Sequence, residues 1–254
     1  ATGVVLTDAN LRVLHANPAG ERLFEAGDGV ELRLGRVALA DRWAQRRPEA
    51  VAAVSLGEAG ERRELTWAAM SDQVTRLAEA LVRLGVEQGD RVAIFLPMSQ
   101  EVAIASHACA HIGAIQVPIF SGFAAPAVAQ RLQASEAKVA ITTRVSSRRG
   151  REVPMLEILE EARAESPSVE HVVLAPWDDL VADLPGELPP AELPSETPYL
   201  LTYTSGTTGK PKGVVHVQGG FLVSIAREVC YQADAGPDDV IHFATDMGWI
   251  MGPW

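Results

Sequence analysis

The chain has 254 residues, of which 47% are apolar and 22% charged, as in an ordinary soluble globular protein. The formal net charge of −11 argues against sequence-independent binding to nucleic acid. The two cysteines lie far apart and no apolar run approaches the roughly 20 residues of a membrane span, so we expect a cytoplasmic protein with neither a disulfide framework nor a membrane partner.

The first 40 residues form a short unit of their own. Apolar runs within 3–15 flank a turn signal and predict two strands. Val4-Val-Leu-Thr-Asp8 and Val13-Leu-His-Ala-Asn-Pro18 resemble a PAS-like sensory segment of bacterial regulators, over a stretch too short for a whole ligand pocket. We therefore assign residues 1–40 to a partial PAS-like segment, which is a natural fusion, a domain remnant or a gene-model artefact.

Predicted strands and helices alternate from residue 41 onward. Thr66-Trp67 opens an amphipathic helix that Gly85 closes, and its apolar residues at helical spacing are Val74, Leu77, Leu81 and Leu84. Further strands are expected at 90–96, 114–118 and 139–142, with a helix over 99–113. This alternation predicts an α/β fold with a mainly parallel sheet flanked by helices on both faces.

The last eighty residues continue this pattern around a connector. Residues 176–198 are rich in proline and acid, which predicts an exposed connection. Gly219-Gly220 precede a helix expected at 221–231, a turn is expected at 235–239, and 240–244 reads as a strand.

Residues 203–213 read Tyr-Thr-Ser-Gly-Thr-Thr-Gly-Lys-Pro-Lys-Gly and lie between apolar runs. The glycines let main-chain N–H groups approach a ligand, the hydroxyls donate hydrogen bonds and the lysines supply positive charge. Lys210 precedes a proline, so the loop lacks the Gly-Lys-Ser/Thr of a P-loop, and no Gly-x-Gly-x-x-Gly opens a helix. The composition still predicts a loop that binds a nucleotide polyphosphate.

Tyr203–Gly213 resembles the phosphate-binding signature of the adenylate-forming superfamily. Three earlier segments share this resemblance, which covers residues 41–254: Leu65-Thr-Trp67, Gly89–Pro97 and Gly113–Pro118. Acetyl-CoA synthetases and related short-chain acyl-CoA synthetases are most similar at Phe120-Ser-Gly-Phe123, Val215–Gly220 and Thr245–Gly252. The resemblance implies the N-terminal part of the adenylate-forming fold, incomplete at the C-terminus.

The resemblance also implies a reaction and its substrates. In this family a carboxylate and ATP, with Mg²⁺, form an acyl-adenylate and pyrophosphate, and the acyl group then passes to CoA as AMP leaves. Lys212 would be the principal cation for the departing phosphates. The implied phosphate-binding residues are Thr204, Ser205, Gly206, Thr207, Thr208, Gly209, Lys210 and Lys212.

Arg148-Arg-Gly-Arg151 places three arginines within four residues of an acidic chain. By pattern alone a solvated surface turn is the favoured interpretation. It resembles the Arg-Gly-Gly-Arg segment with which acetyl-CoA synthetases contact CoA phosphate, so the resemblance implies CoA binding by Arg148, Arg149, Gly150, Arg151 and Met251. Met251 stands where relatives commonly carry a threonine, and a thioether donates no hydrogen bond. Trp249 and Ile250 would line the acyl pocket.

No catalytic residue and no metal site is assigned. His107 and His111 are four apart on a predicted helix, but no third ligand accompanies them. In relatives the adenine-binding segments, an acidic residue associated with magnesium and a C-terminal domain with a catalytic lysine all follow the matched region. We therefore expect an N-terminal fragment that does not catalyse the full reaction alone.

Two other functions stay open. The chain could belong to an adenylation domain that loads a carrier protein, although the arginine cluster at 148–151 argues against it. It could also be a non-catalytic nucleotide-binding or sensory module, regulated by the PAS-like start.

Overall fold

The computed structural model describes residues 47–58, 60–204, 211–234 and 239–253, together with the backbone of four short strands near the N-terminus. These strands are β1 (Val5–Thr7), β2 (Val13–Ala16), β3 (Val30–Arg33) and β4 (Arg36–Leu39). β1 pairs antiparallel with β2, and β3 pairs antiparallel with β4. The two strands predicted within 3–15 are confirmed, whereas the PAS-like assignment of residues 1–40 stays a prediction.

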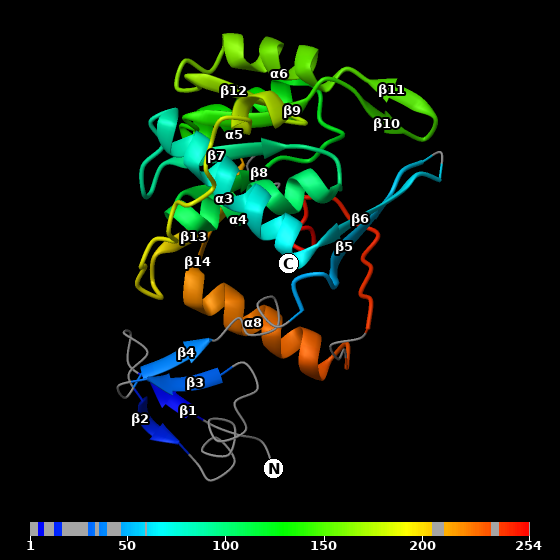
Figure 1. Cartoon of the computed structure of the whole chain (residues 1–254). Helices are drawn as coiled ribbons and strands as arrows, with labels where there is room; N and C mark the ends of the chain where they lie inside the picture. Colours follow the sequence, from blue (N-terminus) through cyan, green and yellow to red (C-terminus); the bar gives the residue numbers. More distant parts are fainter. Residues whose placement is uncertain are drawn as a thin grey trace.

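A six-stranded sheet forms the centre of the described structure, in the order β12-β9-β7-β8-β13-β14 (Figure 1). Its strands are β7 (Arg91–Phe95), β8 (Ile115–Pro118), β9 (Val139–Thr143), β12 (His171–Ala175), β13 (Pro198–Thr204) and β14 (Lys212–Val217). All neighbouring strands are parallel except β13 and β14, which form an antiparallel hairpin. The predicted, mainly parallel α/β sheet is confirmed.

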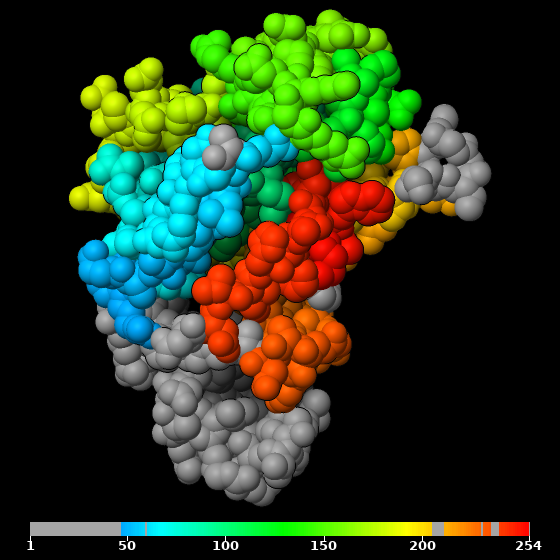
Figure 2. Space-filling view, turned by 90° about the vertical axis from the view of Figure 1, so that its right-hand side faces the viewer, coloured from blue at the N-terminus to red at the C-terminus, as the bar shows by residue number. Residues whose placement is uncertain are grey.

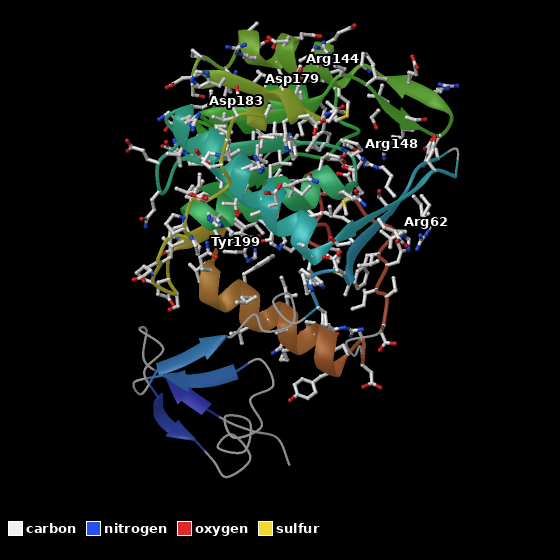
Figure 3. The ribbon with its side chains drawn as sticks, in the orientation of Figure 1. Arg62, Arg144, Arg148, Asp179, Asp183 and Tyr199 are labelled. Carbon is white, nitrogen blue, oxygen red and sulfur yellow. The ribbon has the colours of Figure 1, made fainter. Side chains whose placement is uncertain are left out.

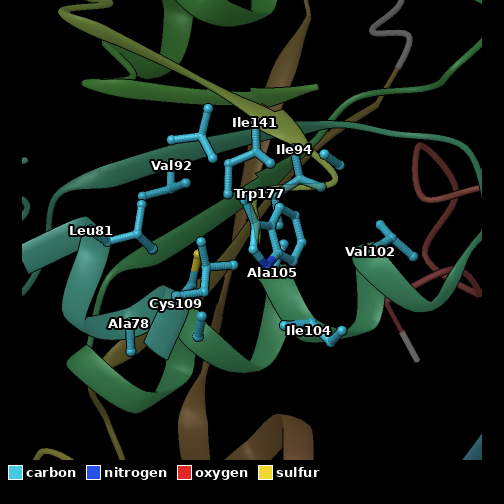
Figure 4. Close-up of a cluster of buried hydrophobic side chains, with 14 of the residues drawn as sticks. Ala78, Leu81, Val92, Ile94, Val102, Ile104, Ala105, Cys109, Ile141 and Trp177 are labelled. Atoms are coloured by element: carbon cyan, nitrogen blue, oxygen red, sulfur yellow. The ribbon is translucent and has the colours of Figure 1, made fainter. Parts of the chain in front are cut away.

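Helices cover both faces of this sheet because successive side chains of a strand point to opposite sides. Val92 and Ile94 of β7 pack with α3 (Trp67–Arg83) and α4 (Gln100–Ile112), in a core that includes Leu81, Cys109 and Trp177 (Figure 4). Ala93 and Phe95 of the same strand pack on the other face, against α5 (Ala125–Ser135) and α6 (Met155–Ala164).

The predicted start and end of α3 and the predicted end of α4 are confirmed, and each has a local cause. Thr66 is the N-cap of α3, where its hydroxyl accepts a hydrogen bond from the Ala69 N–H at 3.2 Å. Gly85 follows this helix with φ +84°, and Gly113 ends α4 with φ +72°, a backbone conformation that glycine adopts without steric cost.

Two antiparallel hairpins project from this body. β5 (Val51–Leu56) pairs with β6 (Arg62–Thr66), and β10 (Ser146–Arg148) pairs with β11 (Arg151–Val153). Figure 1 shows the long β5–β6 hairpin reaching toward the β10–β11 hairpin. No helix within the described ranges is long and apolar enough to cross a membrane.

Three predictions about the second half need correction. The helix α8 (Gln218–Tyr231) begins before the glycine pair, so Gly219 and Gly220 lie in its first turn. The connector at 176–198 contains the short helix α7 (Asp178–Val181) and buries Trp177 and Leu184, so it is only partly exposed. Residues 240–244 do not form a strand, because an extended segment becomes one only by pairing, and this segment pairs with no described strand.

Candidate active site

A cleft of about 610 Å³ lies at the side of the sheet where its parallel strands have their carboxyl ends. The chain leaves β7 for a helix on one face and leaves β8 for a helix on the other, so these adjacent strands form a topological switch point. Open parallel sheets bind ligands at such points, outside the carboxyl ends of the strands. Pro97 and Met98 after β7, and Phe120 and Ser121 after β8, line this cleft.

The segment 239–253 supplies a second wall of the cleft. Asp246 accepts hydrogen bonds from the Ser121 N–H (3.1 Å), the Ser121 hydroxyl and the Gly248 N–H (3.0 Å). The Trp249 ring meets the Phe120 ring edge-on, with 6.5 Å between centroids. Figure 2 shows this segment in red, beside the blue and cyan β5–α3 region and the orange α8.

Gly248 is the residue that permits this close approach. A Cβ at Gly248 would lie 2.3 Å from the Cβ of Phe120 and 2.5 Å from its Cα. Real Cβ atoms do not approach backbone atoms so closely, so a side chain here would push the two segments apart.

The β10–β11 hairpin supplies the third wall through Ser146, Ser147 and Arg148. The Arg148 guanidinium lies 4.7 Å from the centroid of the Phe120 ring, a cation–π arrangement. A Cβ at Gly122 would lie 2.1 Å from Arg148 Nη1, so glycine leaves the room that this side chain uses. Figure 3 labels Arg148 beside the β10–β11 hairpin.

The structure separates the predicted CoA and acyl residues into two groups. Arg148, Trp249 and Met251 line the cleft together, although about one hundred residues separate the first from the other two. Ile250 is exposed and is not among the lining residues. The other three predicted CoA residues, Arg149, Gly150 and Arg151, lie in and beside the hairpin turn, where the two arginines line a neighbouring hollow of about 790 Å³.

The base of the predicted phosphate loop lies at the same edge of the sheet. Thr204 ends β13 directly opposite Lys212, the first residue of β14, and both are exposed. Because β13 runs parallel to β8, its carboxyl end lies at the edge that carries the cleft. The other predicted loop residues, Ser205, Gly206, Thr207, Thr208, Gly209 and Lys210, lie outside the described residues.

The helical histidines have structural partners. His107 donates from Nδ1 to the Ala103 carbonyl at 2.8 Å, and His111 donates from Nε2 to the Leu188 carbonyl at 2.7 Å. Between them, burial raises the pKa of the Cys109 thiol to about 12, which keeps it protonated. Across the described parts of the chain, no three His, Cys, Asp or Glu side chains gather where they could hold a metal ion.

Sequence reasoning assigned roles to only three of the lining residues, Arg148, Trp249 and Met251; those it missed include Pro97, Met98, Ser121 and Asp246. Phe120 and Asp246 belong to the segments on which the family resemblance rests, but only 249–251 received roles there. The signal in the sequence that could have found lining residues was a position just after a predicted parallel strand. The carboxyl ends of such strands meet at one edge of the sheet.

Comparisons with known proteins show what the chain as a whole is similar to. A family model described as AMP-binding enzyme matches residues 40–254. An acetyl-coenzyme A synthetase of Coprinopsis cinerea is 39% identical over 228 residues, covering 84% of this chain and 34% of that protein. An acetyl-coenzyme A synthetase of Streptomyces coelicolor is 40% identical over 212 residues, which cover 77% of this chain and 33% of that protein.

A solved structure, the acetoacetyl-CoA synthetase from Streptomyces lividans, superimposes with a TM-score of 0.78 at 33% identity. The match covers 83% of this chain and 34% of that one. The chain thus spans about a third of the length of the relatives it matches.

Proposed function

Because the chain belongs to the AMP-binding enzyme family, we propose that the complete protein is an AMP-forming short-chain acyl-CoA synthetase. Residues 41–254 would be the N-terminal portion of its AMP-binding domain, preceded by the PAS-like segment 1–40. The observation that carries the proposal is the cleft in which Arg148 faces Trp249 across Phe120, at the sheet edge that also carries Thr204 and Lys212.

Two bond exchanges make up the proposed reaction. A carboxylate oxygen of the substrate attacks the α-phosphorus of ATP, and the bond to pyrophosphate breaks. The CoA thiol then attacks the acyl carbon, the bond to AMP breaks, and the thiol proton is released. Mg²⁺ would neutralise charge on the ATP phosphates, but the described residues offer no cluster that would hold it, so none of them is assigned to the metal.

The chain's own groups fit the charges of this reaction. Lys212 and Thr204 sit where the predicted loop leaves the sheet, so they would contact the β and γ phosphates as negative charge builds up on pyrophosphate. Arg148 offers a planar guanidinium that suits a CoA phosphate. Phe120 and Trp249 present apolar ring surface to a short acyl chain.

Lys212→Ala in the complete protein tests the adenylation role. Removal of one preorganised cation should lower carboxylate-dependent ATP–pyrophosphate exchange by about 10²-fold. Arg62→Ala serves as the control, since it removes an exposed cation that pairs with Glu64 on β6, and exchange should stay at the wild-type rate. Wild-type exchange in Lys212→Ala would exclude this lysine from the reaction.

Arg148→Gln separates the two enzyme hypotheses. If Arg148 binds CoA, this variant keeps ATP–pyrophosphate exchange and raises the KM for CoA. An adenylation domain that loads a carrier protein instead predicts no CoA-dependent release of AMP in either the wild type or the variant.

A further inference from the structure

Glu58, at the tip of the β5–β6 hairpin, holds the turn of the β10–β11 hairpin. Its Oε1 accepts a hydrogen bond from the Arg149 N–H (2.6 Å), and its Oε2 accepts bonds from the Gly150 N–H (2.9 Å) and the Ser147 hydroxyl (2.8 Å). The Gly150 N–H first, then Ser147 and the Arg149 N–H, lower the pKa of the Glu58 carboxyl. The ionised carboxylate is therefore the form that this turn selects.

The turn needs such a partner because of its backbone. Arg149 has φ +54° and Gly150 has φ +71°, so two successive residues adopt the left-handed conformation of a tight hairpin turn. Arginine pays a steric penalty in that conformation, unlike glycine. Hydrogen bonds from both N–H groups to one carboxylate offset this penalty and favour the turn over other loop conformations.

The same β5–β6 hairpin is fastened at a second point. Arg63 on β6 makes a two-pronged ion pair with Glu101 in the first turn of α4, with N–O distances of 2.7 and 3.0 Å. Pro97 and Met98, which line the cleft, lie just before this helix. The β5–β6 hairpin therefore connects two walls of the cleft, the loop after β7 and the β10–β11 hairpin.

Arg148 lies between the residues that Glu58 holds. Its two neighbours in the chain, Ser147 and Arg149, both donate to the Glu58 carboxylate, so the backbone of Arg148 is fixed on each side. Its side chain lies over Phe120, against Gly122. Movement of the turn would carry the guanidinium away from this position.

We propose that Glu58 is a positioning residue for CoA: its carboxylate fixes the β10–β11 turn so that Arg148 stays in the cleft, ready for a CoA phosphate. This inference rests on the proposed acyl-CoA synthetase function. Competition would have the opposite effect, since a phosphate bound to the N–H groups of Arg149 and Gly150 would displace Glu58. Glu58 does not line the cleft, however, so a phosphate bound at Arg148 need not displace it.

Glu58→Ala in the complete protein tests this role. We expect the KM for CoA to rise about tenfold or more, because displacement of a binding group by about an ångström is costly. ATP–pyrophosphate exchange and the KM for the carboxylate should not change. Glu58→Gln, which keeps one acceptor oxygen and the same shape, should give an intermediate KM, and Glu61→Ala removes the same charge from the same hairpin as a control.

Hydrogen exchange of the 147–150 segment supplies a readout that does not depend on activity. The Arg149 and Gly150 amides should exchange faster in Glu58→Ala than in the wild type or in Glu61→Ala. An unchanged KM for CoA in both Glu58 variants would overturn the proposal, and a lowered KM would show competition instead. If Arg148→Gln leaves the KM for CoA unchanged, the CoA assignment itself is wrong, whatever the exchange rates at the turn.

Discussion

Gly248→Ala should loosen the cleft while leaving the central sheet folded. The added Cβ would lie 2.3 Å from Phe120 Cβ, 2.5 Å from its Cα and 2.7 Å from its nitrogen, all fixed parts of the neighbouring loop. The backbone at Gly248 is not in the left-handed region, so the perturbation is steric rather than conformational. One of the two segments must therefore move.

The cost follows from what such a movement breaks. Forcing a methyl group into packed structure typically costs 1–3 kcal/mol. The Ser121 and Gly248 hydrogen bonds to Asp246 would lengthen as well, although Asp246 is partly exposed and water replaces part of their energy. We expect the substitution to destabilise the closed cleft by about 2 kcal/mol in total. If the carboxylate binds only to the closed cleft, this corresponds to about a 30-fold loss of its affinity.

The measurement is the KM for the carboxylate, combined with hydrogen exchange at Ser121 and Gly248. Gly220→Ala is the matched control: its Cβ would lie 3.4 Å from Val217 Cγ2, an ordinary contact, and alanine favours the helix α8. The control should keep the wild-type KM. Wild-type KM and wild-type exchange in Gly248→Ala would refute the inferred packing of 239–253 against Phe120.

Three further predictions concern stability and can be measured by denaturant unfolding. Leu81→Ala should lower the free energy of unfolding by about 2–5 kcal/mol, because Leu81 is fully buried. A decrease below about 1 kcal/mol would argue against the core in Figure 4. Thr66→Ala should cost about 1 kcal/mol by removing the bond from the Ala69 N–H, whereas Thr66→Ser should retain most of it. For Glu101, burial is the largest single influence and raises the pKa, but the hydrogen bonds from Arg63, the Glu101 backbone and Ser99, together with the Arg63 charge, outweigh it, so the net pKa is lowered. A depressed carboxyl pKa stabilises the fold above the unfolded-state pKa, so Glu101→Gln should cost up to about 1 kcal/mol at neutral pH and less below about pH 4; an equal loss at both pH values would contradict this.

Local signals were sufficient for three strands of the sheet and for the helices α3 and α4. The N-cap at Thr66 and the glycines at 85 and 113 act within one turn of a helix, so a short stretch of sequence contains the whole interaction. Apolar runs bounded by turn residues placed β7, β8 and β9 in the same way. The strand expected at 240–244 was wrong because pairing depends on a partner elsewhere in the chain, which an apolar run does not specify.

By itself the sequence determined the family and the mainly parallel α/β sheet, and it predicts a phosphate loop at 203–213, since all three depend on contiguous residues with characteristic composition. Only the tertiary structure decided that Arg148 and Trp249 share a cleft while Ile250 does not line it, and that Glu58 reaches the turn beside Arg148. These contacts join residues about ninety or more positions apart. Their proximity follows from how strand ends meet at one edge of the sheet and from where glycine leaves room, which no local pattern records.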